Sequence, residues 1–211
     1  LSLGLKLTDP IIVSVGRVAQ EKSIDVIINE MPKLIKKLPD VKFVIVGDGP
    51  KRADLEEQSQ ALGIKNSVIF AGAKPWDEIG KSYQLGDVFV SASTSETQGL
   101  TYIEAMAASV AVVAKKDRSV EKVVIDGETG YYFDHNEEVA DVLYKALTAP
   151  DKNQALRERA LKNIAHLSSE VFGKSVEELY YDVLKNAPTK KARKLPKINI
   201  KKGILLGRFG K

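Results

Sequence analysis

Residues 41–50 read VKFVIVGDGP, a short apolar run rich in β-branched residues that ends at a glycine. A run of this length and composition is typical of a strand that is buried on both faces of a parallel sheet. Pro50 follows closely and suits the first turn of a helix, where its missing N–H costs nothing. We therefore expect a strand over 41–47 and a helix from Pro50 to about Leu62.

The same alternation of apolar run and amphipathic segment recurs along the chain. The predicted strands are IIVSVG (11–16), VKFVIVG (41–47), SVIFAG (67–72), DVFVSAS (87–93) and VAVVAKK (110–116). Strands that are separated by helices predict right-handed crossovers and a parallel sheet. The expected fold class is α/β, a doubly wound Rossmann-like parallel sheet with helices on both faces.

The intervening helices are recognised by their spacing of apolar residues. In Glu21–Leu38, apolar residues recur every three or four positions and form one stripe. The stripe consists of Ile24, Ile27, Ile28, Met31, Leu34 and Ile35. The other expected elements are a helix that opens at Pro75 and Trp76, helices over 101–108, 136–149, 151–166 and 168–186, and a strand-like return at 127–133.

Composition excludes several classes of site and location. The chain of 211 residues has no cysteine, which rules out disulfides, thiolate zinc sites and cysteine catalysis and fits a cytoplasmic protein. The longest apolar runs are far shorter than the ~20 residues that a membrane-spanning helix needs. The N-terminus, LSLGLKLTDP, lacks the layout of a signal peptide.

The positive charge is concentrated at the C-terminus. Nine of the 32 Lys and Arg residues, and none of the 28 Asp and Glu residues, follow position 187, so residues 1–187 hold 23 basic and 28 acidic groups. We expect a domain over 1–187 and a basic tail over 188–211. The tail mixes cations with apolar residues, as do segments that lie on anionic membranes, although a tail without structure explains it equally well. No nucleic-acid partner is expected, because the basic charge is not spread over the domain.

The loop after the first predicted strand offers a phosphate site. Gly16 allows a tight turn, and Arg17 and Lys22 flank the start of the next helix, where the helix dipole also favours anions. The loop is neither a dinucleotide fingerprint nor a P-loop. Taken alone, it is explained better as an exposed first turn. Gly47 and Gly49, after the second strand, are explained best by the needs of the turn itself.

The stretch SASTSETQGLTYIEAMA, residues 91–107, is the strongest signal in the chain. Gly99 places the N–H groups of Leu100 and Thr101 at a helix start, where they can donate to an anion. Glu96 and Glu104 flank that turn, and two such carboxylates can accept hydrogen bonds from sugar hydroxyls. Glu104 could instead be an exposed helix glutamate, but its apolar neighbours predict a buried segment in which a carboxylate needs a polar partner.

Four segments together resemble the C-terminal domain of the family 4 retaining glycosyltransferases, which have the GT-B fold. They are GRVAQEKSIDVII, VIVGDGPKRADLE, VIFAGAKPWDEIGKSYQLGDVFVSAS and SETQGLTYIEAMA, in that order and spacing. The likeness extends from about Leu5 to Leu184. The last segment is similar to bacterial diacylglycerol glucosyltransferases.

The resemblance implies a role for each site residue. Arg17 and Lys22 would neutralise the diphosphate, Glu104 would receive the ribose hydroxyls, and Glu96 would lie against the donor sugar as nucleophile or as electrostatic support. Catalytic roles thus fall on Glu96, Arg17 and Lys22. The implied donor-binding residues are Gly16, Lys74, Pro75, Gly99, Leu100, Thr101 and Glu104, with the loop at 72–75 facing the base. No metal and no cofactor is implied, because the nucleotide sugar is a substrate.

Three departures from the family pattern stand out. Ser109 and Ala111 replace a glycine and a proline that shape the turn after the helix, which puts its geometry in question. The family's N-terminal, acceptor-binding domain has no counterpart in this chain, and its catalytic-side histidine belongs to that domain. His135 and His166 are expected to be surface residues.

The expected function is donor binding in an enzyme that transfers a hexose, with retention, from a UDP-sugar to a hydroxyl. The acceptor would be a diacylglycerol-type lipid or a saccharide, the location cytoplasmic with attachment to the inner face of the plasma membrane, and the fragment alone inactive. Two alternatives remain open, a non-catalytic partner subunit of GT-B type and a nucleotide-sugar epimerase of GT-B fold.

Overall fold

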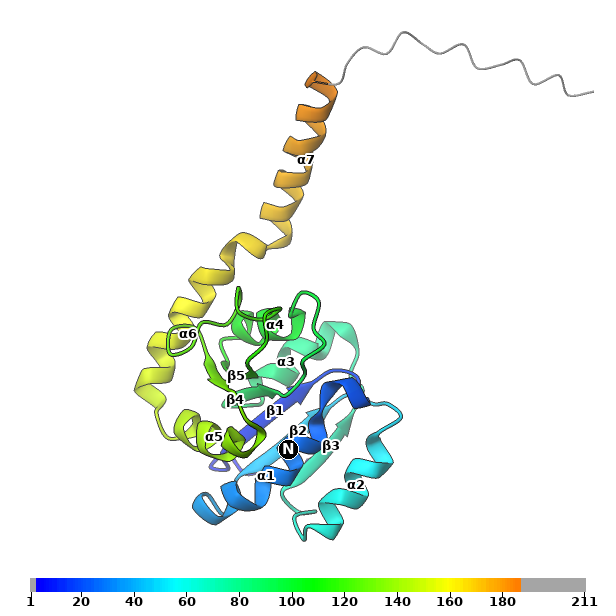
Figure 1. The fold of residues 1–211 in the computed structure, drawn as a ribbon, viewed down its shortest axis with the longest axis vertical. Helices are drawn as coiled ribbons and strands as arrows, with labels where there is room; N and C mark the ends of the chain where they lie inside the picture. Colours follow the sequence, from blue (N-terminus) through cyan, green and yellow to red (C-terminus); the bar gives the residue numbers. More distant parts are fainter. Residues whose placement is uncertain (1–2, 187–211) are drawn as a thin grey trace, which may run out of the picture. The chain divides into compact units, whose positions relative to one another are not determined.

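The computed structural model describes residues 3–186 and contains one parallel sheet. Its strands are β1 (Ile11–Val15), β2 (Lys42–Val46), β3 (Val68–Gly72), β4 (Val88–Ser91), β5 (Ala111–Lys115) and β6 (Tyr131–Phe133). They lie side by side in the order β3-β2-β1-β4-β5-β6 (Figure 1). All five predicted strands are confirmed, and the strand-like return at 127–133 contains β6.

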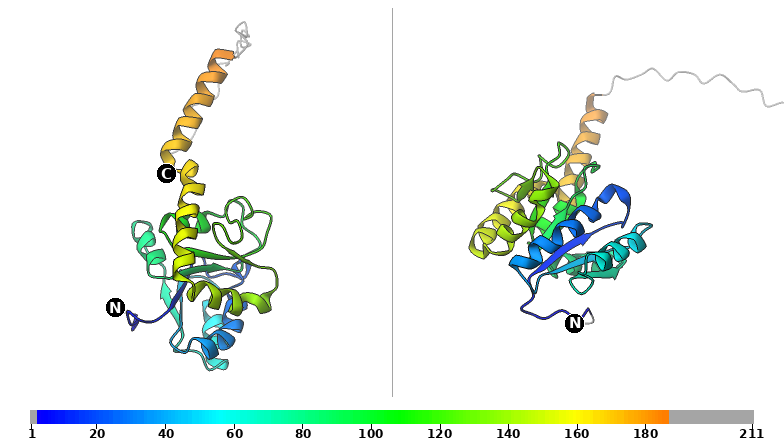
Figure 2. Two further views of the ribbon diagram at one scale, coloured as in Figure 1. Left: turned by 90° about the vertical axis from the view of Figure 1, so that its left-hand side faces the viewer. Right: turned by 60° about the horizontal axis from the view of Figure 1, so that its bottom comes forward.

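Helices cover both faces of this sheet, as two further views show (Figure 2). The α-helices are α1 (Ile24–Lys37), α2 (Arg52–Ala61), α3 (Ile79–Gln84), α4 (Leu100–Ala107), α5 (Val139–Leu147), α6 (Pro150–Ile164) and α7 (Ser169–Asn186). Buried side chains of α1, α2 and α5 form the core on one face, and those of α3 and α4 form the core on the other. The predicted doubly wound α/β fold is therefore confirmed.

The strand order determines where a ligand can bind. The chain leaves β1 in one direction across the sheet and β4 in the other, so a crevice opens at their carboxyl ends. In open α/β sheets, ligands bind in this crevice. The loops after β1 and β4, which carry most of the predicted site residues, therefore lie next to each other.

The loops after β1 and β2 are joined by their backbones, which explains Gly47 and Gly49. The N–H of Gly16 donates to the carbonyl of Val46, and the N–H of Lys51 donates to the carbonyl of Val18. A Cβ at Gly47 would lie 1.8 Å from the carbonyl oxygen of Gly16. The interpretation of Gly47 as a structural glycine is thus confirmed by this close approach.

The first helix differs in detail from its prediction. Residues Gln20–Lys22 form a single 3₁₀ turn, Ser23 takes the left-handed conformation with φ of 49°, and α1 begins only at Ile24. The predicted start at Glu21 was therefore three residues early. The apolar stripe itself is confirmed, because Ile24, Ile27, Ile28, Met31 and Leu34 are buried.

Short 3₁₀ turns also precede α3 and α5 and follow α6, at Trp76–Glu78, Asn136–Glu138 and Ala165–Leu167. Within the described part of the chain, residues 3–168 form one compact unit, and a second unit begins with α7 at Ser169. The predicted boundary at 187/188 and the basic tail lie outside the described residues. Within residues 3–186, no helix is both long and apolar enough to cross a membrane.

Candidate functional site

The loop after β1 delivers two cations to the carboxyl end of the sheet. Lys22 ends the 3₁₀ turn, and the sharp bend at Ser23 directs the chain from this turn into α1. Arg17 is exposed, and its guanidinium lies 3.9 Å from the carboxylate of Glu21. Lys22 is more enclosed, with 26% of its side chain exposed.

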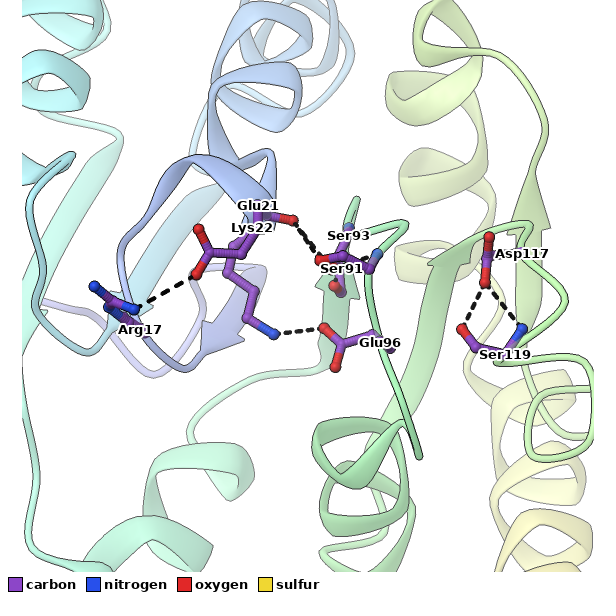
Figure 3. Close-up of polar contacts among 9 residues, drawn as sticks. Arg17, Glu21, Lys22, Ser91, Ser93, Glu96, Asp117 and Ser119 are labelled. Atoms are coloured by element: carbon purple, nitrogen blue, oxygen red, sulfur yellow. Dashed lines mark hydrogen bonds and ion pairs between the residues drawn. The ribbon is translucent and has the colours of Figure 1, made fainter.

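Lys22 and Glu96 point toward one another across the crevice (Figure 3). The Lys22 Nζ lies 2.6 Å from the Glu96 Oε1, although 74 residues separate the two in sequence. Only 11% of the Glu96 side chain is exposed. The structure therefore brings together the cation predicted for the diphosphate and the carboxylate predicted for the donor sugar.

Two serines hold the loop after β4 against the 3₁₀ turn. The hydroxyls of Ser93 and Ser95 both donate to the backbone carbonyl of Glu21, at 3.2 and 3.4 Å. Ser93 is fully buried, and its own Oγ also accepts from the N–H of Ser95. These contacts were not predicted from the sequence: serines alternate in SASTS at the strand end, but this pattern does not indicate a backbone carbonyl as their acceptor.

The N-terminus of α4 presents free donors beside this pair. Gly99 precedes the helix with φ of 64°, in the left-handed region that favours glycine. Among the described residues, no group accepts a hydrogen bond from the N–H of Leu100 or Thr101. Free N–H groups at a helix start can donate to an anion, which is the role expected for them from the sequence.

One small cavity is bordered by five of the ten predicted site residues. Gly16, Arg17, Lys22, Glu96 and Thr101 border it. The rest of its wall comes from Ser14, Val15, Ile24, Ile45 and Ser91. A second cavity, of about 780 Å³, lies between α2 and the edge strand β3 and contains none of the predicted site residues.

Glu104 has a partner that the sequence analysis did not identify. Its Oε2 accepts a hydrogen bond of 2.7 Å from the hydroxyl of Tyr83, a fully buried residue of α3. Burial, and then the hydrogen bond to Glu104, raise the pKa of Tyr83 well above its usual value. Burial of the segment was predicted and is confirmed for Ala105 and Met106, but Ile103 is half-buried and Ala107 is exposed. Glu104 itself is exposed, because it lies on the outer side of α4.

Lys74 and Pro75 are exposed and lie in the loop after β3. Two strand spacings, about 10 Å, separate β3 from β1, so these residues are not in contact with the Lys22–Glu96 pair. His135 and His166 are both exposed, as predicted.

The turn after α4 keeps its form despite the replaced glycine. Ser109 adopts φ of 59°, and its N–H donates to the carbonyl of Met106. Ala111 begins β5, so the strand survives the loss of the proline. The departure therefore places a non-glycine residue in the left-handed region at Ser109, and β5 still follows the turn.

The combined geometry suits a molecule with a diphosphate at its centre. An ammonium group and free N–H donors converge at one end of the sheet, and both stabilise phosphate oxygens. The carboxylate of Glu96 borders this cavity and can accept hydrogen bonds from hydroxyl groups, whereas Glu104 does not border it.

Solved structures of other proteins share this fold. The chain superposes on HepE from Anabaena, determined with UDP and glucose, with a TM-score of 0.75 and 20% identity over 82% of this chain and 48% of that one. It superposes on the pneumococcal O-GlcNAc transferase GtfA, determined with UDP and GlcNAc, with a TM-score of 0.72 and 20% identity over 82% of this chain and 36% of that one. These likenesses show the fold.

Sequence comparison identifies nearer relatives. The chain is 38% identical over 185 residues to the alpha-monoglucosyldiacylglycerol synthase of Streptococcus pneumoniae, covering 86% of this chain and 41% of that protein. It is 34% identical over 182 residues to the synthase of the same name from Acholeplasma laidlawii, covering 86% and 46%. The chain thus spans less than half the length of either relative. Residues 2–163 match the family model described as glycosyl transferases group 1, and the chain belongs to that family.

Proposed function

We propose that this chain binds a nucleoside diphosphate sugar and forms the donor half of a retaining hexosyltransferase. The observation that carries the proposal is the convergence of Lys22, Glu96 and the free N–H groups of α4 at the carboxyl ends of β1 and β4. The donor domain would comprise residues 1–187.

Each side chain receives a role from its position. Lys22 and the N–H groups of Leu100 and Thr101 would stabilise the negative charge that grows on the leaving diphosphate. Arg17, which is exposed, would turn from Glu21 toward the same phosphates. Glu96, held by Lys22, would face the donor sugar, and Glu104 would accept hydrogen bonds from the ribose.

The base would be uridine and would lie against the loop that contains Lys74 and Pro75. Two structures of the same fold contain UDP, and this loop lies two strands from the diphosphate site, a separation that suits the length of a nucleoside. The backbone of Gly16 would approach the phosphates, because no side chain blocks the turn there.

A direct test is calorimetric titration of the 211-residue chain with UDP, GDP and ADP. We expect UDP to bind and Lys22→Ala to weaken it by roughly ten- to a hundredfold, the range for loss of a hydrogen bond to a charged group. Lys65→Ala, which removes an exposed cation beside the other cavity, is the matched control and should leave the affinity unchanged. Equal binding by the Lys22 and Lys65 variants, or no nucleotide binding at all, would contradict the proposal.

The location is proposed from the basic charge of residues 188–211, and the acceptor from the names of the relatives. Two of them are named for the synthesis of a glucosylated diacylglycerol, so we propose a diacylglycerol-type lipid as the acceptor. The nine basic residues of 188–211 would then hold a cytoplasmic protein at the anionic inner face of the plasma membrane. Co-sedimentation with anionic vesicles should be strong for residues 1–211 and weak for residues 1–187, and equal binding would contradict this attachment.

A further inference from the structure

A buried tyrosine on α3 contacts the carboxylate of Glu104, the residue proposed to bind the ribose. Tyr83 is fully buried, and its hydroxyl donates to the Glu104 Oε2 at 2.7 Å. Its ring packs against Phe89 of β4, with centroids 5.5 Å apart. The hydroxyl is therefore fixed by the core, and water does not compete for it.

Glu104 is placed differently, because it lies on the exposed side of α4. A glutamate on a helix surface normally samples several rotamers, and each ordering of such a side chain costs free energy. The hydrogen bond from Tyr83 selects one of these rotamers and leaves Oε1 free to accept. A carboxylate that is oriented before the ligand arrives binds a diol without this ordering cost.

The proton of this hydrogen bond stays on the tyrosine. Burial and the carboxylate of Glu104 both raise the pKa of Tyr83, so it donates throughout the physiological pH range. Glu104 therefore accepts this hydrogen bond through Oε2.

We infer that Tyr83 is a positioning residue that holds Glu104 in the rotamer that receives the two ribose hydroxyls of the donor. This inference rests on the proposed function, since it assigns the ribose to Glu104. Tyr83 lies on α3, not on α4 with Glu104, and would act on the donor only through Glu104.

The matched control is a second buried tyrosine in the same aromatic cluster. Tyr102 of α4 is also fully buried and packs edge-on against Phe89, with centroids 5.8 Å apart. Its hydroxyl lies toward the side chain of Ser91 and makes no hydrogen bond to Glu104. Tyr102→Phe thus deletes a buried hydroxyl from the same cluster without altering Glu104.

The experiment compares UDP with dideoxy-UDP, which lacks both ribose hydroxyls, by calorimetry on the 211-residue chain. The unmodified chain should prefer UDP by roughly tenfold or more, as a hydrogen bond to a charged group predicts. Tyr83→Phe should reduce the affinity for UDP about three- to tenfold and leave that for dideoxy-UDP unchanged. Tyr102→Phe should change neither affinity.

The outcomes separate the assignment of the ribose to Glu104 from the positioning role of Tyr83. If Glu104→Ala keeps the full preference for UDP, the assignment of the ribose to Glu104 fails, and the inference fails with it. If Glu104→Ala abolishes the preference but Tyr83→Phe retains it, only the inference on Tyr83 is overturned. A Tyr83→Phe chain that loses both affinities equally, or does not fold by circular dichroism, also overturns it, because the hydroxyl would then support the fold.

Discussion

The Lys22 Nζ and the Glu96 Oε1 lie 2.6 Å apart at the point where the loops after β1 and β4 meet. The two side chains are largely enclosed, with 26% and 11% of their surfaces exposed. An anionic ligand that enters the crevice must share Lys22 with a carboxylate that already holds it. Glu96 therefore competes with the phosphates of a ligand for the ammonium group of Lys22.

Glu96→Gln should strengthen the binding of UDP. The substitution keeps the shape of the side chain but removes the negative charge that competes for Lys22. An ion pair of this kind contributes about 1 kcal/mol, which corresponds to roughly a fivefold change in affinity. Calorimetry with UDP measures the effect, and Glu57→Gln, an exposed carboxylate on α2, gives the control. Weaker binding by the Glu96 variant would show that the carboxylate assists the diphosphate.

Ser109→Gly should stabilise the protein. A non-glycine residue at φ of 59° carries about 1 kcal/mol of strain, which glycine does not have. We expect the free energy of unfolding to rise by about that amount and the thermal midpoint to rise by ~2–4 °C. Ser109→Ala keeps the Cβ and should bring no gain, so a gain in the alanine variant would argue against strain as the cause.

Gly47→Ala should unfold the chain or destabilise it by more than about 3 kcal/mol, beyond the range of most single substitutions. The new Cβ would overlap the carbonyl oxygen of Gly16, which is backbone and has no room to move. Gly63→Ala is the control, since its φ of 71° is also positive but no atom lies within 4 Å of the added Cβ. Its cost should be about 1 kcal/mol in urea unfolding followed by circular dichroism. Similar losses for both variants would contradict the role of the close contact.

Stability should fall in acid partly because of Glu138. Its Oε2 accepts hydrogen bonds from the N–H groups of Asp134 and His135, and these bonds lower the pKa of Glu138. A carboxyl whose pKa is lower in the folded state contributes stability above its unfolded pKa, about 4.3, and loses it as the pH falls through the folded value.

Glu138→Gln should therefore show a smaller loss of stability between pH 5 and pH 3 than the unmodified chain. Unfolding free energies from urea titrations over this range measure the difference. Glu137→Gln changes the neighbouring exposed carboxylate and should leave the pH profile as it was. An identical profile for the Glu138 variant would show that these hydrogen bonds do not favour the folded state.

The fold could be predicted because its determinants are local. Each strand appears as a short apolar run, and the order of strands and helices in the chain implies a parallel sheet. The meeting of Lys22 and Glu96 also follows from this reasoning, since both come from strand ends on one edge of the sheet. The start of α1 could not be predicted, because Ser23 has no sequence feature that favours its left-handed conformation.

The contacts of Glu104 and of the serines lay beyond sequence reasoning for a different reason. The hydrogen bond from Tyr83 depends on how two helices pack side by side, which no periodicity specifies. The exposure of Glu104 depends on the rotation of α4 about its axis, and an apolar segment of eight residues leaves that angle open. Ser93 bonds to a carbonyl, a partner that every residue possesses and that the side-chain pattern does not reveal.

The use of the Glu21 carbonyl as the acceptor has a consequence for how this site tolerates variation. The contact that joins the loops after β1 and β4 does not depend on which side chain position 21 carries. Random substitution at position 21 should thus preserve the junction, whereas position 93, buried and supplying the hydroxyl, has few alternatives to serine. Position 21 should therefore accept many more substitutions than position 93, although the two residues share one hydrogen bond.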